Sequence, residues 1–285
     1  MESGPIIDTH VLLVADDPWR YPFDPAAAPF APGEAESLTR QRALVAALDE
    51  GAFAGAVLVQ RVRTHGFDNR LVCDLAAADP RLRALVAVGP VGEGAASLLG
   101  RPGVAGLRLM EQTKGQGAEW LSGPAARAQW AAAEVHGAVV DVHAYPWNRA
   151  MVLTELDRLA GDYPGARVLL DNLGADPCVP PGASLRPLAR HANLALKFSA
   201  ITLARIADAG IAAADAIGPY LDAFGADRLL WGSDVLPVGI TLAQANAHAR
   251  AALSALPQTQ RAALLHGNAA RLFGLAQAPV RVCSE

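Results

Sequence analysis

The pattern of apolar positions along the chain predicts strands and helices in alternation. Eight short runs rich in Val, Ile, Leu and Ala have the length of buried parallel strands, apolar on both faces. These runs are Ile6–His10, Gly55–Gln60, Leu82–Val88, Val104–Leu109, Val139–His143, Arg167–Leu170, Leu194–Phe198 and Arg228–Trp231. Segments with helical spacing separate most of them and are Ser37–Glu50, Asn69–Ala78, Ala125–His136, Arg149–Ala160, Leu203–Phe224 and Leu242–Leu256.

This alternation favours an α/β fold, and eight strands are the number that a closed (β/α)8 TIM barrel requires. A doubly wound sheet usually has fewer strands and a Gly-rich phosphate turn after the first one. No such turn follows Ile6–His10. The helical pieces Gln258–Leu265 and Asn268–Phe273 are expected to close the barrel after its last strand. The Pro- and Ala-rich stretch Pro18–Gly33 has no periodicity, so we expect an ordered loop over the barrel mouth.

Composition limits the number of domains and the type of partner. With 285 residues, 52% of them hydrophobic, the chain can bury the core of one barrel, so we expect a single domain over residues 1–285. A net charge of −4 gives no basic surplus for nucleic acid or an anionic membrane. We find no secretory signal and no apolar run of the roughly 20 residues that span a bilayer. The three cysteines are far apart and show no paired spacing, which fits a cytoplasmic protein. We expect a small-molecule substrate, and a homodimeric assembly stays open.

Polar residues occur where the predicted strands end, and the catalytic groups of a barrel gather at the C-terminal ends of its strands. The fourth predicted strand carries Arg108, and Arg61 follows the second. The other polar strand ends are Asp8-Thr9-His10, Asp141-Val142-His143, Asp171-Asn172, Lys197-Phe198-Ser199 and Gly232-Ser233-Asp234. One such residue alone is more often structural, but several on one face favour a functional site.

The polar segments also occur in the order of a known family. They are Asp8-Thr9-His10, Gln60 with Gly66-Phe67-Asp68-Asn69, Gly106-Leu107-Arg108, Leu170-Asp171-Asn172-Leu173-Gly174, Lys197-Phe198-Ser199, Trp231-Gly232-Ser233-Asp234 and the stretch from Gly267 to Gly274. In this order they make the chain resemble the amidohydrolase-related family, also called amidohydrolase 2, and within it the 2-pyrone-4,6-dicarboxylate lactonase-like group. The resemblance covers nearly the whole chain. It implies a distorted TIM barrel that hydrolyses a small, often carboxylated, ring ester.

Two positions depart from the pattern of the metal-dependent members of this family. Those members carry His-x-His at the end of the first strand, where two imidazoles can hold one divalent ion. Here the second position is Leu12, and the histidine expected at the end of the sixth strand is replaced by Asn172, a poor ligand for zinc. We therefore expect no metal cofactor. If a divalent ion such as zinc is bound, its expected ligands are His10, His143 and Asp234.

Ester hydrolysis without a metal needs a base that activates water and donors that stabilise the oxyanion. Asp234 is the candidate base, and burial would have to raise its pKa above about 3.9 to make it more effective. His10 and Asn172 are candidate donors to the carbonyl oxygen, and His143 can assist in a suitable protonation state. The structural alternative for Asp234 is a helix-capping carboxylate.

A carboxylated substrate requires cationic partners. The candidates at or just after strand ends are Arg108, Lys197, Lys114 and Arg61. For Arg61 and Lys114, a solvated surface position is the commoner outcome. Tyr21 in the first loop and Tyr145 and Trp147 after the fifth strand could line the pocket with flat apolar surface, or pack in the core or rim.

Three functions stay open on the sequence alone. The first is a metal-independent lactonase or related ester hydrolase, favoured because the Asp and cationic positions are kept. The second is a metal-dependent hydrolase or decarboxylase of the same family. The third is a barrel without catalysis that serves as a binding protein, which the changes at Leu12 and Asn172 also allow.

Overall fold

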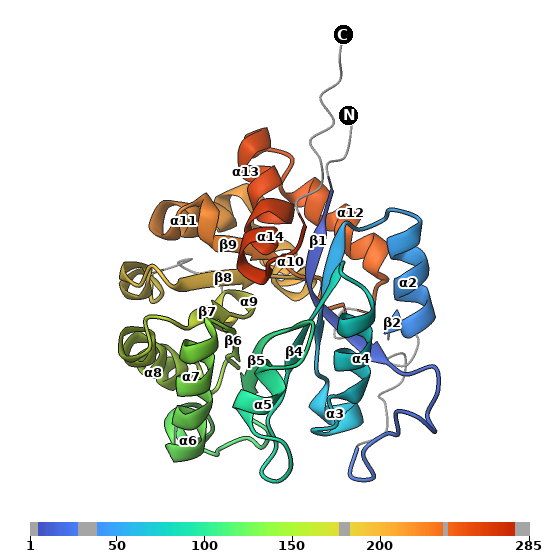
Figure 1. The fold of residues 1–285 in the computed structure, drawn as a ribbon. Helices are drawn as coiled ribbons and strands as arrows, with labels where there is room; N and C mark the ends of the chain where they lie inside the picture. Colours follow the sequence, from blue (N-terminus) through green and yellow to red (C-terminus); the bar gives the residue numbers. More distant parts are fainter. Residues whose placement is uncertain (1–4, 28–38, 177–182, 236–238, 277–285) are drawn as a thin grey trace.

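The computed structural model describes residues 5–27, 39–176, 183–235 and 239–276. Within these ranges, nine strands form one parallel sheet in the order β2-β1-β3-β4-β5-β6-β7-β8-β9. The strands are β1 (Ile7–Val14), β2 (Thr39–Arg40), β3 (Gly55–Val59), β4 (Leu82–Val86), β5 (Val104–Met110), β6 (Val139–His143), β7 (Arg167–Leu170), β8 (Leu194–Phe198) and β9 (Leu229–Trp231). All except the two-residue β2 correspond to predicted runs. The sheet curls and helices surround it (Figure 1), which confirms the predicted TIM-barrel fold.

The barrel closes where β9 meets β1. The Thr9 hydroxyl donates to the carbonyl oxygen of Trp231 at 2.6 Å. Beyond β9, the backbone N–H of Asp234 donates to the carbonyl oxygen of His10 at 3.1 Å. Gly232 is required at this seam, because a Cβ there would lie 2.8 Å from the Cβ of His10. The seam therefore places the residues that follow β9 beside the middle of β1.

The first strand is longer than predicted. The apolar sequence after His10 continues the strand, so that β1 ends at Val14. The register between β1 and β3 shifts between Asp8 and Val11, which is the mark of a β-bulge. Such bulges redirect side chains next to active sites. His10 is thus placed by an irregularity within β1, and its predicted position at the strand end is wrong.

Helices cover the outer face of the sheet (Figure 1). They are α2 (Gln41–Asp49), α3 (Val62–His65), α4 (Arg70–Ala78), α5 (Ala95–Leu99), α6 (Glu119–Ser122), α7 (Pro124–His136), α8 (Arg149–Asp162), α9 (Asn172–Ala175), α10 (Ala200–Asp208), α11 (Ala213–Phe224), α12 (Leu242–Ala252), α13 (Gln258–Ala262) and α14 (Asn268–Phe273). The single long helix predicted over Leu203–Phe224 is wrong, because Gly210 has a φ of +68° and separates α10 from α11. A π-helical turn, Ala263–Gly267, joins α13 to α14. No helix of the described residues is long and apolar enough to cross a membrane.

The apolar core has two parts on the two faces of the sheet. The larger part lies between the strands and the surrounding helices and includes Leu58 and Trp130. The smaller part fills the barrel interior near the N-terminal ends of the strands, where Val139 and Leu169 pack with Phe273 of α14. Helix α14 therefore closes the N-terminal end of the barrel, as the sequence predicts for the last helical segment.

Part of the predicted loop Pro18–Gly33 is described. Residues 18–27 contain no helix or strand, and residues 28–33 lie outside the described ranges. The backbone N–H of Asp24 donates to the carbonyl oxygen of Thr64 at 2.8 Å, which joins this segment to α3. Because α3 directly follows β3, the described part of the loop lies on the side of the barrel where the strands end.

Candidate active site

Four charged side chains form a layer inside the barrel. Arg108 of β5 uses Nη1 to bridge the carboxylates of Asp141, on β6, and Asp171, directly after β7. The ammonium nitrogen of Lys197 on β8 lies 2.9 Å from Asp141 Oδ1 and 2.6 Å from Asp171 Oδ1. All four residues are buried. Two cations and two carboxylates make this charged layer formally neutral, which is the condition under which such groups can be kept from water.

The ionisation of the charged layer follows from these pairings. Burial alone would raise the pKa of Asp171, but Arg108 and Lys197 hold that pKa well below its usual value. Burial alone would lower the pKa of Lys197, but the carboxylates of Asp141 and Asp171 raise it above its usual value. Burial also opposes the charge of Arg108, and the same two carboxylates raise its pKa. Asp171, Lys197 and Arg108 are therefore ionised at neutral pH.

His10 lies between the charged layer and Asp234. Its Nδ1 lies 3.1 Å from the Lys197 ammonium, which can only donate a hydrogen bond. Nδ1 must therefore accept, and a neutral His10 carries its proton on Nε2. That nitrogen lies 3.7 Å from Oδ1 of Asp234. Lys197 thus fixes the tautomer of His10 and turns an N–H donor toward the open side of the barrel.

Asp234 and Asn172 contact each other on the side of His10 that faces away from the charged layer. Nδ2 of Asn172 donates to Oδ2 of Asp234 at 3.3 Å, and Oδ1 of Asn172 accepts from the Ser199 hydroxyl. Ser199 is also the N-cap of α10, where its side chain accepts from the backbone N–H of Thr202. Asn172, expected to be a donor to the substrate carbonyl, is thus oriented by Ser199 and directs an amide hydrogen to Asp234.

The backbone at these two residues is strained. Asp234 has a φ of +41° and Asn172 a φ of +48°, in the left-handed region that residues with a Cβ rarely adopt. Leu173 and Ala175, after Asn172, also have positive φ. Strained backbone of this kind persists where surrounding structure enforces it and clusters at functional sites. The strain therefore supports a functional role for the segments that carry Asp234 and Asn172.

Aromatic side chains extend from the charged layer toward the surface. Nδ1 of His143 lies 3.4 Å from Nη2 of Arg108 and 3.4 Å from Oδ2 of Asp171. The ring of Tyr145 packs edge-on against His143, with centroids 4.5 Å apart, and stacks on Trp147 at 4.3 Å. Trp147 is half exposed. We call His143, Tyr145 and Trp147 the aromatic rim.

Two of the residues predicted to bind substrate, Tyr21 and Arg61, have their described contacts away from the charged layer and the aromatic rim, whereas Lys114 lies beside the rim. Tyr21 donates its hydroxyl to Asp74 of α4 at 2.8 Å. Burial and this carboxylate raise the pKa of Tyr21 to about 12. Arg61 is buried and donates from Nη1 to the hydroxyl of Thr64 in α3. Lys114 is exposed, with its ammonium 5.1 Å from the ring centroid of Trp147, so that it lies at the outer edge of the aromatic rim.

One group of described residues has the composition of a metal site. Ligand atoms of His10, Asp141 and Asp171 come within 4.8 Å of one another, so these three form a possible metal site. The expected ligand set of His10, His143 and Asp234 is not such a group among the described residues, and it stays a prediction. Nδ1 of His143 is directed to Arg108 and Asp171.

Sequence reasoning left several residues out of the candidate site. Asp141 and Asp171 were visible as strand ends, and the signal for their role is that Arg108 and Lys197 inside apolar strands need buried carboxylate partners. Glu111 was also missed. Its Oε2 accepts from Trp147 Nε1 at 2.7 Å, which holds the aromatic rim in place. Burial opposes ionisation of Glu111, but this and other hydrogen bonds lower its pKa.

Comparison with known proteins decides the family. The family model described as "Amidohydrolase" matches residues 7–275. The chain belongs to the amidohydrolase family. This confirms the resemblance inferred from the order of the motifs, and it supports amidohydrolase-type chemistry at the candidate site. A search of curated proteins finds no match.

Solved structures share the amidohydrolase fold at low sequence identity. A probable 2-pyrone-4,6-dicarboxylic acid hydrolase from Acinetobacter baumannii, with citric acid bound, is 20% identical over 95% of this chain and 100% of its own, with a TM-score of 0.71. An amidohydrolase from Burkholderia multivorans with bound zinc is 19% identical over 96% of this chain and 100% of its own, with a TM-score of 0.70. A 2,6-dihydroxybenzoate decarboxylase in complex with 2,6-dihydroxybenzoate is 15% identical over 96% of this chain and 99% of its own, with a TM-score of 0.62.

Proposed function

We propose that this amidohydrolase hydrolyses a small carboxylated lactone or related ring ester, with water activated by Asp234 and without a metal ion. The observation that carries the proposal is the position of Asp234. Its carboxylate lies 3.7 Å from Nε2 of His10 and 3.3 Å from Nδ2 of Asn172, on strained backbone at the end of β9. A carboxylate beside an oriented imidazole N–H supplies a base and an oxyanion donor at one point.

The steps assign one task to each side chain. Asp234 accepts a proton from water while the water oxygen attacks the lactone carbonyl carbon. The Nε2–H of His10 donates to the carbonyl oxygen, on which negative charge develops, and a protonated His143 can add a second donor. The ring C–O bond then breaks, and the proton held by Asp234 passes to the leaving oxygen. The products are a carboxylate and an alcohol on one opened chain.

Substrate recognition is assigned to Arg108 and the aromatic rim. Nη1 of Arg108 is engaged by Asp141 and Asp171, whereas Nη2 is turned toward His143 and can contact a substrate carboxylate. Tyr145 offers a flat surface against which a planar ring can stack. The citric acid and pyrone-dicarboxylic acid named for the A. baumannii protein are both carboxylated molecules, which supports this substrate class by analogy.

The metal-dependent alternative is disfavoured by Lys197. Its ammonium lies 3.1 Å from His10 Nδ1, 2.9 Å from Asp141 and 2.6 Å from Asp171, which are the donors of the possible metal site. A divalent ion placed among these atoms would have to displace the ammonium and would add charge to a neutral layer. The residues therefore do not fit a metal while Lys197 keeps this position, and we assign Lys197 to ordering the layer.

A panel of carboxylated lactones, assayed with and without a chelator, tests the proposal. We expect hydrolysis of at least one member at a rate that chelation leaves unchanged. Activity that is lost on chelation and restored by zinc would favour the metal-dependent alternative. Lactones that bind without turnover would favour a barrel that serves as a binding protein.

A further inference from the structure

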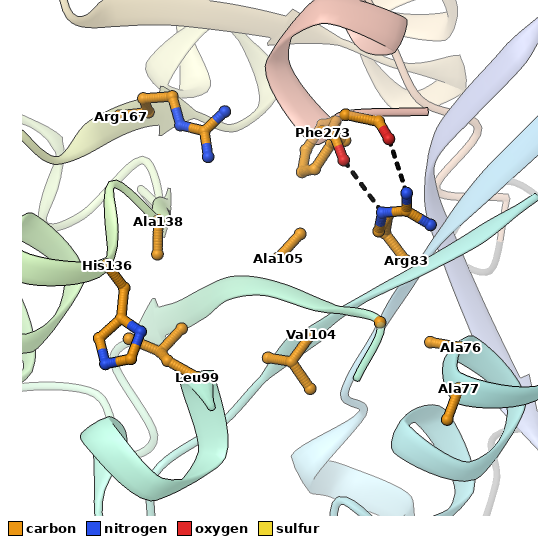
Figure 2. A pocket seen from close by; sticks show the side chains of 12 residues that line it. Ala76, Ala77, Arg83, Leu99, Val104, Ala105, His136, Ala138, Arg167 and Phe273 are labelled. Atoms are coloured by element: carbon orange, nitrogen blue, oxygen red, sulfur yellow. Dashed lines mark hydrogen bonds between the residues drawn. The ribbon is translucent and has the colours of Figure 1, made fainter. Parts of the chain in front are cut away.

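A cavity lies at the opposite end of the barrel from the candidate active site. It has a volume of about 380 Å³ and is lined by the first residues of β5 and β7, by residues of β4, α4 and α7, and by the end of α14. Because all strands are parallel, these N-terminal strand ends share the face that α14 closes. Small side chains such as Ala105 and Ala138 leave the space open (Figure 2).

Two arginines face this cavity from different strands. Figure 2 shows Arg83 of β4 and Arg167 of β7 on two sides of it. Arg83 donates to the carbonyl oxygens of Phe273 at 3.1 Å and Gly274 at 2.6 Å, and from Nη1 to those of Pro80 at 3.1 Å and Leu82 at 2.7 Å, which fixes its guanidinium at the end of α14 and leaves one N–H of Nη2 outside these bonds. Arg167 donates from Nε to the carbonyl oxygen of Gly137 at 2.6 Å and from Nη1 to that of Leu272. Both guanidiniums are therefore held in place by backbone oxygens.

Within the described ranges no carboxylate balances the positive charge of this pair, because the partners of both guanidiniums are backbone carbonyl oxygens. None of the residues that line the cavity is acidic. Nη2 of Arg167 makes no hydrogen bond to another described residue. Burial lowers the pKa of Arg167, and no acidic neighbour counteracts this effect. His136, exposed at the end of α7, adds an imidazole to the lining.

We propose that this cavity binds a small oxyanion, either a phosphate or a carboxylate, through Arg167 and Arg83. The volume falls in the range of small-molecule sites, about 300–1,000 Å³. Planar guanidiniums held by backbone oxygens are suited to carboxylate and phosphate groups, since their remaining N–H donors are already oriented. The candidate active site has the reverse character, because its arginine and lysine are each paired with carboxylates. The site is independent of the proposed hydrolase activity.

Isothermal titration with inorganic phosphate and, separately, with malonate tests the proposal in a chloride buffer of constant ionic strength. The two arms distinguish a phosphate site from a carboxylate site. Ala77, an exposed residue of α4 that lines the cavity, provides the sharpest variant. Ala77→Glu places a negative charge at the cavity and leaves both arginines unsubstituted. Ala78→Glu, also exposed on α4 but outside the lining, is the matched control.

We expect saturable binding of at least one oxyanion to the wild-type protein and to Ala78→Glu. Ala77→Glu and Arg167→Gln should each weaken it by about tenfold or more, since each alters a charge-assisted contact. Melting curves identify variants that fail to fold, and Ala77→Glu alone is decisive if Arg167→Gln unfolds. Absence of saturable binding by both oxyanions at concentrations on the order of 10 mM overturns the proposal. Binding that Ala77→Glu leaves unchanged, or that Ala78→Glu weakens equally, also overturns it.

Discussion

The interior of the barrel changes from apolar to charged over two residues along β6, β7 and β8. On β6 and β7, Val139 and Leu169 point into the apolar layer that packs against α14. Two positions further along, Asp141 and Asp171 point into the charged layer. On β8 the corresponding change is from Ala195 to Lys197. The period of two that directs these side chains to one face is the same, so only residue type separates the two layers.

The difference shows how the fold divides stability from function. The apolar layer contributes by burial and by packing against α14, and any well-fitting apolar residue can serve there. The charged layer has a large desolvation cost, which its internal pairing offsets. What the charged layer supplies is orientation, since it fixes Arg108 and the tautomer of His10. Substitutions in the two layers should therefore have separable effects on stability and on rate.

The largest expected effect is the loss of rate on substitution of Asp234, which lies on the outer side of the charged layer. Asp234→Asn keeps the shape of the side chain but removes the proton acceptor, so kcat should fall on the order of 10²–10⁴-fold with a smaller change in KM. The melting temperature should change little. Steady-state kinetics on an active lactone, with Asp208→Asn on the exposed end of α10 as control, measures this. A folded Asp234→Asn enzyme with the wild-type rate would exclude Asp234 as the base and leave His10 or His143.

Next in size is a pair of substitutions, one at Asp171 directly after β7 and one at Leu169 within β7. Asp171→Asn leaves Arg108 and Lys197 under-neutralised and should cost about 3–5 kcal/mol of unfolding free energy, as for other broken buried pairs. Leu169→Ala, two residues earlier in the apolar layer, should cost about 2–5 kcal/mol by leaving a cavity. Only Asp171→Asn should also reduce kcat, because it disturbs the groups below His10. Urea denaturation and kinetics measure both, and an equal loss of kcat in Leu169→Ala would refute the division between layers.

The stability difference between wild type and Asp171→Asn should depend on pH, and the pKa shifts of Asp171 and Lys197 give the direction of that dependence. The pKa of Asp171 is depressed in the folded state, so the stability from its ionised form is present above about pH 4 and is lost as pH falls further. The pKa of Lys197 is raised, so its contribution is present below about pH 10 and is lost only as pH rises through the higher folded-state value. The stability difference between wild type and Asp171→Asn should therefore be constant near neutral pH and shrink below about pH 4.

The fold could be predicted from the sequence because each barrel strand is a short apolar run, and β6, β7 and β8 have the predicted bounds. The site could be predicted only as a set of strand ends. Pairing among the charged residues depends on which strands are neighbours across the barrel, and the sequence does not give those distances. The sequence also does not show the bulge at His10, which lies in the pairing of β1 with β3, or the positive φ of Asp234.

A smaller effect is expected from replacing Lys197. This substitution tests whether its ammonium occupies the place that a metal ion could take. Lys197→Met removes the charge at similar length and leaves His10, Asp141 and Asp171 facing one another. We expect substoichiometric zinc in the wild-type protein and at least about tenfold higher zinc affinity in the variant, because a divalent ion would restore the missing charge. Elemental analysis and titration measure this. Stoichiometric zinc in the wild type would contradict it, as would equal affinity in both proteins.

Introducing histidine at Leu12 and Asn172, where metal-dependent members of the family carry it, tests for a metal site on the Nε2 side of His10. Leu12→His combined with Asn172→His should raise zinc affinity with Lys197 still in place, because both additions supply imidazole ligands. The same elemental analysis serves as the measurement. No gain in this double variant would mean that the space near Nε2 of His10 has the wrong geometry for an ion.

The smallest expected effect lies at the aromatic rim, on Lys114. This lysine is exposed, and its ammonium is 5.1 Å from the ring centroid of Trp147, which stacks on Tyr145. If it steers a substrate carboxylate, Lys114→Met should raise KM by about threefold with kcat unchanged, since exposed charge pairs contribute less than about 1 kcal/mol. The difference from wild type should vanish at high salt, where such attraction is screened. Arg205→Met, at an exposed position on α10, is the control for the loss of one positive charge. A KM that Lys114→Met leaves unchanged at low salt would assign Lys114 to the solvated surface.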